Sequence, residues 1–246
     1  MTIAVVIPTL NEERTLPLTL SHTAGMGFDE LIVVDGGSHD RTREIVSSYS
    51  SARNSGTPQS ASYIQHSALL PVTLITTTPG RARQMNAGAA ASKGDVLLFL
   101  HADTSLPSDA RQAIKRALEN PACVGGRFDA RFDQDKGFGW LISRMMNLRS
   151  RWTGIATGDQ AIFVRRSVFE QLGGYSDLPI MEDVDFTCRL KRTGQLAALR
   201  SKVTTSYRRW DAYGPLRTIL LMWALRFLYW IGISPHKLRH LYTAVR

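Results

Sequence analysis

Short apolar runs alternate with helical patterns over the first 105 residues of the chain. The runs are apolar on both sides and rich in β-branched residues or leucine, which is typical of parallel strands covered on both faces. They are IAVVIP (3–8), ELIVVD (30–35), VTLIT (72–76) and DVLLFLH (95–101). Helical patterns separate them: 12–24 after a cap at Asn11, 41–49 after Ser38 or Asp40, and 81–91. This order predicts an α/β fold, an open and mostly parallel twisted sheet with helices on both faces.

The second half of the chain is less regular. We expect helices at 108–120, 137–152, 167–173 and 181–194, and strands at 124–132 and 160–166. Residues 47–71 are rich in Ser, Ala and Gln and have no clear periodicity, so they predict a long surface loop before the third strand.

Charge is distributed unevenly along the 246 residues. There are 30 Lys and Arg against 21 Asp and Glu, a net charge of +9, and 12 of the basic residues but one acid, Asp211, follow Asp185. A basic final quarter favours an anionic partner: a diphosphate, an anionic lipid or a nucleic acid.

The 43% hydrophobic content is that of a folded domain, and two cysteines without CxxC spacing predict reduced thiols. The N-terminal apolar run is too short for a signal peptide and predicts a buried strand.

Polar residues stand at the ends of the four predicted strands. They are Pro8-Thr9-Leu10-Asn11-Glu12, Asp35-Gly36-Gly37-Ser38, Gly80-Arg81-Ala82-Arg83 and His101-Ala102-Asp103. Ligands of open α/β sheets bind beyond the carboxyl ends of the strands, so these residues predict one binding edge. Turn and cap chemistry is the competing explanation for any one strand end, and it is weaker for all four together.

A phosphate-binding site here needs cations, because the chain has neither GxGxxG nor GxxxxGK[ST]. Asp103 is the obvious ligand for Mg²⁺ or Mn²⁺, which bind one or two protein oxygens together with phosphate. His101 is a poor Mg²⁺ ligand but could hydrogen-bond a ribose.

Five segments in order and spacing resemble the family 2 glycosyltransferases, which have the GT-A fold. They are VVIPTLNEE, LIVVDGGSHDRT, NAGAAASKGDVLLFLHADT, FVRRSVFEQLGGY and MEDVDFTCRLKRTG, between Ile3 and about Gly194. The resemblance implies transfer of a sugar from a UDP- or GDP-sugar to a hydroxyl acceptor, with Mn²⁺ or Mg²⁺ as cofactor. FLHADT, GRARQMNAGAAA and TGDQAIF are similar more specifically to a small bacterial subgroup associated with arsenosugar biosynthesis or carotenoid glycosylation.

The resemblance also implies residue roles on the donor side. The base and ribose would be bound by Pro8, Thr9, Asn11, Glu12 and Asp35. His101-Ala102-Asp103 occupies the family's Asp-x-Asp position, where the first acid usually faces the ribose and the last binds the metal, so Asp103 keeps the metal role. Arg81 or Arg83, together with Arg208 and Arg209 of TSYRRW (205–210), would contact the diphosphate.

On the acceptor side, Glu182-Asp183 matches the family's Glu-Asp pair, whose Asp is the catalytic base in inverting members. A carboxylate in the first turn of a helix is stabilised as an anion. Gly158, Asp159 and Gln160 would lie near the acceptor, and Trp210 could stack on it.

The run TILLMWALRFLYWIGI (218–233) contains Arg226 and is too short to span a bilayer. The run could lie in the core, in an oligomer interface or on a bilayer surface, and its Trp, Tyr, Lys and Arg flanks suit a headgroup layer.

We expect a GT-A domain, 1–210, with a nucleotide-binding half, 1–105, and an acceptor half, 106–210, followed by a basic, apolar helical tail, 211–246. The partners would be the donor and a small-molecule or lipid-type acceptor. The location would be the cytoplasm, with peripheral contact at the inner face of the plasma membrane or a homodimer through 211–246.

Three other functions fit parts of the sequence less well. A non-catalytic nucleotide-sugar or membrane-surface binding protein would explain the missing first Asp, but both Asp103 and Asp183 are retained. A nucleotidyltransferase would need a Gly-rich basic loop after the first strand, where PTLNEERT stands. A nucleic-acid binder would need exposed aromatics among basic residues, whereas the aromatics of the tail lie in an aliphatic run.

Overall fold

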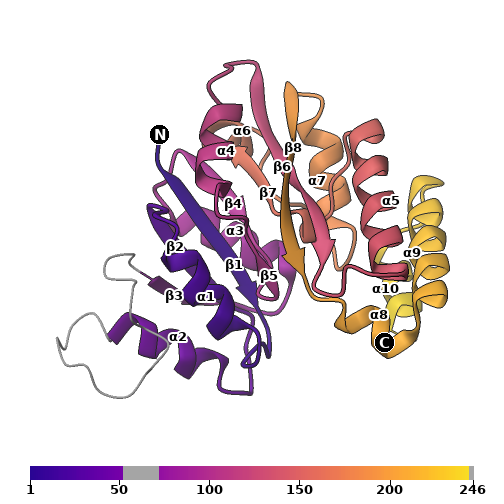
Figure 1. Ribbon diagram of the computed structural model, residues 1–246, viewed down its shortest axis with the longest axis horizontal. Coiled ribbons are helices and arrows are strands. Elements are labelled where there is room, and N and C mark those ends of the chain that lie inside the picture. Colours follow the sequence, from indigo (N-terminus) through magenta and orange to yellow (C-terminus); the bar gives the residue numbers. More distant parts are fainter. Residues whose placement is uncertain (52–71, 244–246) are drawn as a thin grey trace.

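The computed structural model describes residues 1–51 and 72–243, and one eight-stranded sheet forms the centre of that part of the chain (Figure 1). Its strand order is β3-β2-β1-β4-β7-β6-β8-β5. The strands are β1 (Ile3–Thr9), β2 (Glu30–Asp35), β3 (Val72–Thr76), β4 (Val96–Phe99), β5 (Thr104–Ser105), β6 (Cys123–Phe132), β7 (Ile162–Arg165) and β8 (Gln195–Thr205).

The first four strands in spatial order are parallel, as their sequence pattern predicts. β1 pairs in parallel with β2 and β4, and β2 with β3. β7 runs antiparallel between β4 and β6, and β8 pairs in parallel with β6. Ile3, Val5 and Ile7 of β1 face one buried cluster, and Ala4 and Val6 face the other, because successive side chains of a strand point to opposite faces. The expected α/β sheet with helices on both faces is confirmed.

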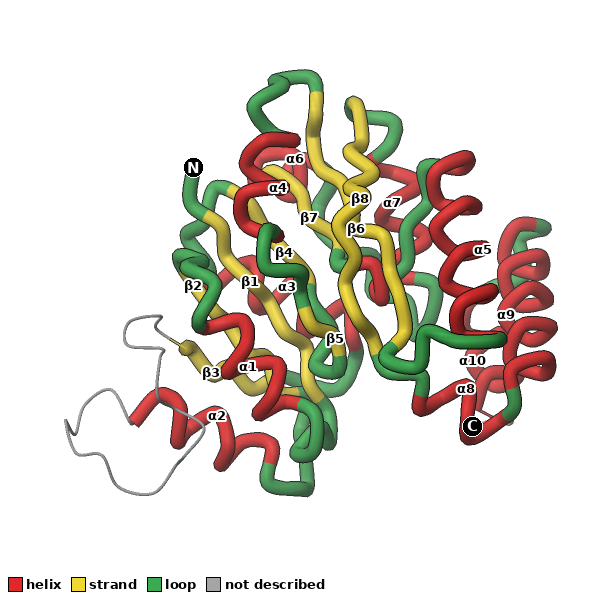
Figure 2. The backbone as a smooth tube through the Cα atoms, in the orientation of Figure 1, coloured by secondary structure: helices red, strands yellow, loops and turns green. Residues whose placement is uncertain are grey.

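Helices cover both faces of the sheet and one of its ends (Figures 1 and 2). One face carries α1 (Leu16–Ala24), α2 (Thr42–Ser51) and α4 (Ala110–Ala117). The other face carries α3 (Arg81–Ala91), α6 (Arg166–Gln171) and α7 (Glu182–Leu190). At the end of the sheet lie α5 (Phe138–Thr153), α8 (Arg208–Tyr213), α9 (Pro215–Trp230) and α10 (Pro235–Thr243), together with the 3₁₀ turn η1 (Gly158–Gln160).

Small residues let α3 pack tightly on the parallel strands. A Cβ atom on Gly88 would lie 2.3 Å from Cγ1 of Val6, so no larger residue fits there without a shift. One turn earlier on the same face of the helix, Gln84 is buried, and its Nε2 donates to the carbonyl oxygens of Thr9 (2.7 Å) and Val34 (2.8 Å). Gln84 therefore ties together the carboxyl ends of β1 and β2, where the strand-end residues stand.

The first helix begins later than predicted. It starts at Leu16, with Pro17 in its first turn, and not at Glu12 after a cap at Asn11. Asn11 has a positive φ of 55°, which Asn tolerates better than most residues, and its Oδ1 accepts a hydrogen bond from the backbone N–H of His39. Because Asn11 is committed to the loop after β2, it ties two strand ends together and does not cap α1.

Two further predictions were wrong in the described residues. The long loop was expected from residue 47, but α2 continues to Ser51; residues 52–71 of that prediction lie outside the described residues. Strand β8 was not predicted, because QLAALRSKVTT carries Arg200 and Lys202 on a largely exposed face and has no alternating pattern. β8 leads directly to Arg208 and the tail.

The tail is neither core nor a spanning helix. Within α9 and α10 the buried side chains are Thr218, Leu225 and Leu238. Trp230 is 80% exposed, and Leu220, Trp223 and Phe227 are more than half exposed. Among the helices described, none has the length and apolar character needed to cross a bilayer.

Candidate active site

A cavity of about 1500 Å³ opens beyond the carboxyl ends of β1 and β4 and extends to α5, α9 and α10. Most of the residues singled out from the sequence line it, although they come from six separate segments of the chain. Those that line it are Pro8, Thr9, Glu12, Arg81, Arg83, His101, Ala102, Asp103, Gly158, Asp159, Glu182, Asp183, Arg208 and Trp210.

Asp35 and Asn11 lie behind the cavity. The carboxylate of Asp35 is fully buried and accepts hydrogen bonds from the backbone N–H groups of Gly37 and Ser38 at 3.0 Å each, and from the Ser38 hydroxyl. The same hydroxyl accepts from the backbone N–H of Asn11 (2.9 Å). The two residues shape the loops that follow β1 and β2.

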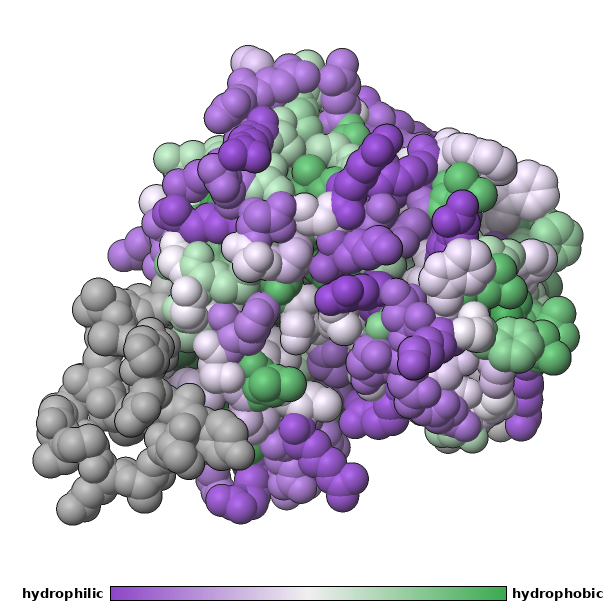
Figure 3. All heavy atoms as spheres, in the orientation of Figure 1, coloured by the Kyte–Doolittle hydropathy of each residue, from purple (hydrophilic) through white to green (hydrophobic). Residues whose placement is uncertain are grey.

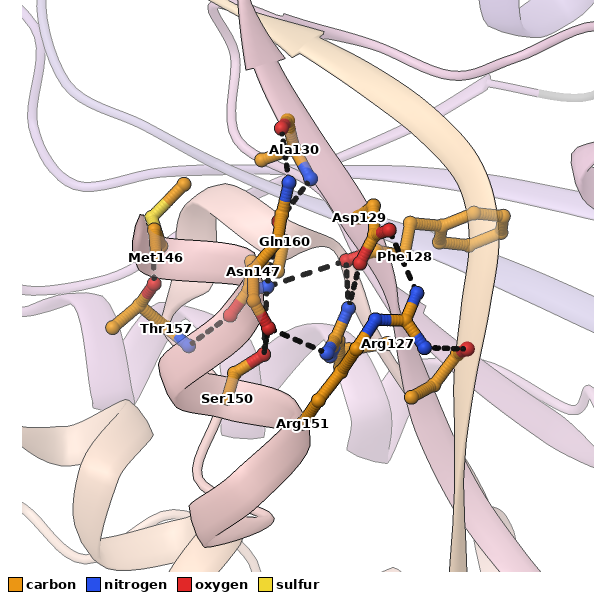
Figure 4. A network of polar contacts seen from close by, with 11 residues as sticks. Arg127, Phe128, Asp129, Ala130, Met146, Asn147, Ser150, Arg151, Thr157 and Gln160 are labelled. Atoms are coloured by element: carbon orange, nitrogen blue, oxygen red, sulfur yellow. Dashed lines mark hydrogen bonds and ion pairs between the residues drawn. The ribbon is translucent and has the colours of Figure 1, made fainter. Parts of the chain in front are cut away.

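Gln160 also lies outside the cavity. It is fully buried, and its Nε2 donates to Ser150 Oγ (3.1 Å) while its Oε1 accepts from the backbone N–H of Thr157 (3.3 Å). Figure 4 shows Gln160 pointing toward Ser150 and Asn147 of α5. Gln160 therefore holds η1 against α5 and supports the cavity wall. The side chain of Arg209 lies outside what the structure describes.

His101 is held between η1 and the end of β4. Its Nδ1 lies 3.2 Å from Oδ1 of Asp159, and its Nε2 is buried with no hydrogen-bond partner in the described residues. A Cβ atom on Gly158 would lie 2.2 Å from that Nε2, so the imidazole fits only because residue 158 is glycine. The first position of His-Ala-Asp thus faces Asp159.

Asp103 lines the cavity and is free to take a ligand. Among the described residues its carboxylate accepts one long hydrogen bond, from the Thr104 hydroxyl to Oδ1 at 3.5 Å, which leaves its oxygens available. In the part of the chain that is described, no three His, Cys, Asp or Glu residues cluster closely enough to hold a metal ion by themselves. One carboxylate fits Mg²⁺ or Mn²⁺ only where phosphate oxygens and water complete the ligand set.

Glu182 and Asp183 open α7 and have different environments. Glu182 is buried and its Oε1 lies 3.2 Å from Nη1 of Arg81. Burial raises the pKa of the Glu182 carboxyl, the charge of Arg81 opposes that rise, and Asp183 adds to it. Burial alone would lower the pKa of Arg81, but Glu182, Asp183 and Asp159 outweigh it and raise that pKa above its ordinary value.

Asp183 is the member of the pair that is not neutralised by an arginine. Its Oδ2 accepts from the backbone N–H of Gly158 (2.8 Å) and its Oδ1 from that of Val184 (2.7 Å). Met181, just before the pair, has a positive φ of 66°, a strained conformation for a residue with a side chain. The strained turn and the two backbone donors fix the position of the Asp183 carboxylate at the cavity wall.

Three of the arginines singled out from the sequence, Arg81, Arg83 and Arg208, are already paired with acids. Arg83 forms a bidentate contact with Asp177, including Nη2 to Oδ2 at 2.8 Å, and Arg208 lies 3.5 Å from Glu12. All three paired arginines remain about half exposed, so an incoming diphosphate can compete for their guanidinium groups.

Trp210 lines the cavity below the tail. Its ring stacks on Tyr207 with 14° between the planes, and it packs edge-on against Phe132 at 5.8 Å. One ring face is therefore taken up by the protein.

Three residues of this region were missed from the sequence: Gln84, Arg149 and Arg226. Gln84 lies inside a recognised helix, and its two carbonyl partners come from strands far away in sequence. Arg149 of α5 and Arg226 of α9 line the cavity from the side of the tail. The one signal for Arg226 was a charge inside an otherwise apolar run.

Residues 4–173 match the family model described as Glycosyl transferase family 2. Among curated proteins, the chain is 28% identical over 213 residues to a probable glycosyltransferase, YdaM, of Bacillus subtilis, which covers 78% of this chain and 47% of that protein. It is 31% identical over 181 residues to undecaprenyl-phosphate 4-deoxy-4-formamido-L-arabinose transferase of Pseudomonas aeruginosa. This match covers 69% of this chain and 49% of that protein. The chain spans about half the length of these relatives.

Solved structures share the fold at low sequence identity. S. aureus TarS 1-349 in complex with UDP-GlcNAc gives a TM-score of 0.62 at 17% identity over 84% of this chain and 58% of that one. Mannosyltransferase PcManGT from Pyrobaculum calidifontis, in complex with GDP-Man and Mn²⁺, gives a TM-score of 0.60 at 19% identity. That match covers 83% of this chain and 56% of the other. These likenesses confirm the GT-A type of fold.

Proposed function

The chain belongs to glycosyl transferase family 2, and on that basis we propose that it moves a sugar from a nucleotide-diphosphate sugar to an acceptor hydroxyl. The observation that carries the proposal is that Asp103 and Asp183, one free to bind a ligand and one fixed by backbone donors, line the same cavity. A binding protein without turnover would have no need for a second acid held in this way.

The donor would lie at the ends of β1 and β4. The base and ribose would contact Pro8, Thr9 and Glu12, with His101 and Ala102 below the sugar, while Asn11 and Asp35 shape the loops from behind. UDP-GlcNAc and GDP-Man are bound by two proteins of the same fold, which supports a UDP- or GDP-sugar here.

The diphosphate would be held by a divalent cation on Asp103 and by arginines. The cation, Mn²⁺ or Mg²⁺, supplies positive charge to the departing nucleoside diphosphate. Arg81, Arg83 and Arg208 are close enough to share that task when the donor draws them from their present partners. Arg209, of the same TSYRRW segment, is part of the proposal.

Asp183 would be the general base of an inverting transfer. It accepts the proton of the acceptor hydroxyl as the oxygen bonds to the sugar carbon and the bond from that carbon to the diphosphate breaks. Glu182 would help to position Asp183 and influence its charge, because the carboxylate of Glu182 itself is turned to Arg81. Gly158, Asp159 and Trp210 would border the acceptor, and Gln160 would support them.

The remaining features are proposals of the same kind. The acceptor is a small molecule or a lipid-type molecule, and the relative from Pseudomonas aeruginosa is named for a lipid-linked one. Residues 1–105 and 106–210 would be the nucleotide and acceptor halves, and 211–246 would contact the inner face of the plasma membrane or a second copy of the chain. The narrower similarity to the arsenosugar- or carotenoid-associated subgroup is part of the proposal.

A thermal-shift screen of nucleoside diphosphates and nucleotide-sugars, each with and without Mn²⁺, tests the donor directly. We expect one nucleotide series to raise the unfolding temperature, and to do so more with Mn²⁺. No stabilisation by any nucleoside diphosphate at millimolar concentration would rule out a donor site.

A further inference from the structure

Within the described part of the chain, two arginines on the tail side of the cavity form no ion pair with an acid. Arg149 projects from α5 and Arg226 from α9, and both line the cavity. Among the described residues Arg149 Nε and Nη2 are shielded from solvent and have no hydrogen-bond partner. The arginines of the donor side differ, because Arg81 and Arg83 each have a carboxylate within 3.2 Å.

A shielded guanidinium without a partner destabilises a protein unless something else satisfies it. The pKa of Arg149 is lowered to about 10. Burial is the largest cause, and the charge of Arg226 adds to it. Burial likewise lowers the pKa of Arg226. Arginine is protonated at neutral pH, and the charge of Arg226 lies close enough to disfavour that of Arg149. Asp183 and Asp159 exert an opposite influence on both, but neither forms an ion pair with them.

The walls around these two charges are apolar. Ile142 and Met146 of α5 and Ile219, Met222 and Leu225 of α9 line the same end of the cavity. The ribose and phosphates of a nucleotide match such walls poorly. An anionic group carried on a hydrocarbon chain satisfies both the guanidinium groups and the walls.

The apolar lining continues onto the surface of the molecule. Met145, Leu220, Trp223 and Phe227 line the cavity and are also exposed, by 39% to 68%. On the outer face the exposed row is extended along α5 by Leu141, Leu148 and Trp152, and along α9 by Leu216 and Trp230. The spacing of three or four residues keeps each row on one side of its helix. Figure 3 shows apolar side chains gathered at this edge of the molecule. Continuous apolar surface of this kind marks a binding site more often than chance exposure does.

We propose that Arg149 and Arg226 bind the phosphate of an amphiphilic acceptor whose hydrocarbon chain lies along α5 and α9. That the bound amphiphile is the sugar acceptor rests on the proposed function, whereas the anion site itself does not. Phosphate matches the pair better than a carboxylate does, because a phosphate monoester carries about −1.5 to −2 charges at pH 7 and has three acceptor oxygens for planar guanidinium forks.

The phosphate is the anchor and not the attacking group. A phosphate anion needs no base to attack a sugar carbon, which would leave Asp183 without a proton to accept. Asp183 lines the same cavity, so a hydroxyl next to the bound phosphate comes within its reach. The acceptor class is therefore a long-chain molecule whose headgroup has both a phosphate and a hydroxyl.

Binding of dodecyl phosphate to the full chain, below its micelle concentration, tests the anion site by isothermal titration calorimetry. Dodecanol is the uncharged control ligand, and inorganic phosphate is the control without a chain. We compare the wild type with Arg149→Gln/Arg226→Gln and with a matched control, Arg144→Gln/Arg217→Gln, which removes one exposed arginine from each of the same helices.

We expect dodecyl phosphate to bind the wild type and the control alike, and the cavity variant about tenfold or more weakly, since each lost hydrogen bond to a charged group contributes substantially. Dodecanol should bind all three proteins equally. A wild type that binds dodecyl phosphate no more tightly than dodecanol, or a cavity variant with unchanged affinity, overturns the proposal.

Two further measurements separate this proposal from its alternatives. The unfolding temperature of the cavity variant should equal or exceed that of the wild type, because unpaired buried charges are removed; a large decrease would mean that the arginines stabilise the fold. The affinity for the nucleoside diphosphate from the donor screen should not change. If it falls as much as that for dodecyl phosphate, the pair belongs to the donor site and the proposal is wrong. If no nucleotide binds but dodecyl phosphate does, the donor proposal fails while the anion site stands.

Discussion

Replacement of Asp183 by Asn tests the general base with the smallest change of shape. The substitution removes the negative charge and leaves one side-chain oxygen. In the wild type both oxygens are used, one by the backbone N–H of Gly158 at 2.8 Å and one by that of Val184 at 2.7 Å. The asparagine amide can accept only one of these hydrogen bonds, and its NH₂ group must face the other donor.

The structure sets the size of two separate effects. The lost hydrogen bond to a charged acceptor should lower the free energy of unfolding by about 1–3 kcal/mol. Loss of a positioned base should lower kcat by about 10²–10⁴-fold. The donor affinity should not change, because the donor-side residues at the ends of β1 and β4 are untouched.

The assay is the release of nucleoside diphosphate from the donor identified by the screen, with water as acceptor, so that the natural acceptor need not be known. Asp185→Asn is the matched control. Asp185 lies on the same helix, and its Oδ2 accepts from Ser176 Oγ (2.8 Å) and Arg189 Nε (2.9 Å), but it does not line the cavity. The control should lose stability and keep its rate. Equal release rates in wild type and Asp183→Asn, with both folded, would refute the base assignment.

Three other changes test the neighbouring geometry. Asp103→Asn should abolish the Mn²⁺-dependent part of nucleoside diphosphate affinity, about tenfold or more; titrations with and without Mn²⁺ that give the wild-type difference would exclude the metal role. Gly158→Ala should cost about 1–3 kcal/mol by overpacking against His101, whose Nε2 would lie 2.2 Å from the new Cβ, and should weaken donor binding; thermal unfolding and titration measure both. The hydrogen bond from the backbone N–H of Thr2 lowers the pKa of Asp95 below its ordinary value of 3.8, so Asp95 stabilises the fold above that pH and ceases to do so as the pH falls through the folded-state pKa. The difference in unfolding temperature between wild type and Asp95→Asn should therefore be present at neutral pH and shrink as the pH falls below 3.8, and a difference that stays constant in acid would contradict this.

The parallel half of the sheet was predictable because its strands are buried on both faces. A strand such as β1, with Ile3, Val5 and Ile7 on one side and Ala4 and Val6 on the other, has no polar face and cannot be mistaken for a surface strand. β8 has the opposite character: most of its side chains are partly exposed, and only Val203 and Thr205 are buried. A strand held mainly by its ladder to β6 leaves little periodic signal in its sequence.

The site was predictable as far as strand ends determine it. Parallel strands put their carboxyl ends on one edge, so Thr9, His101 and Asp103 had to meet. Which acid pairs with which arginine depends on tertiary distances, and the pairing of Arg81 with Glu182 and of Arg83 with Asp177 has no local signature. The buried side of Gln84 was hidden for the same reason.

The tail completes the cavity and is not an appendage to it. Residues of α9 and α10 line the same cavity as Pro8 and Asp103, which come from the first half of the chain. Arg208, which connects β8 to the tail, contacts Glu12 from the end of β1. A boundary at residue 210 therefore separates two stretches of sequence that build one cavity. Because its walls change from polar at the strand ends to apolar at α9, the cavity would join the proposed donor site to the surface proposed for a hydrocarbon chain.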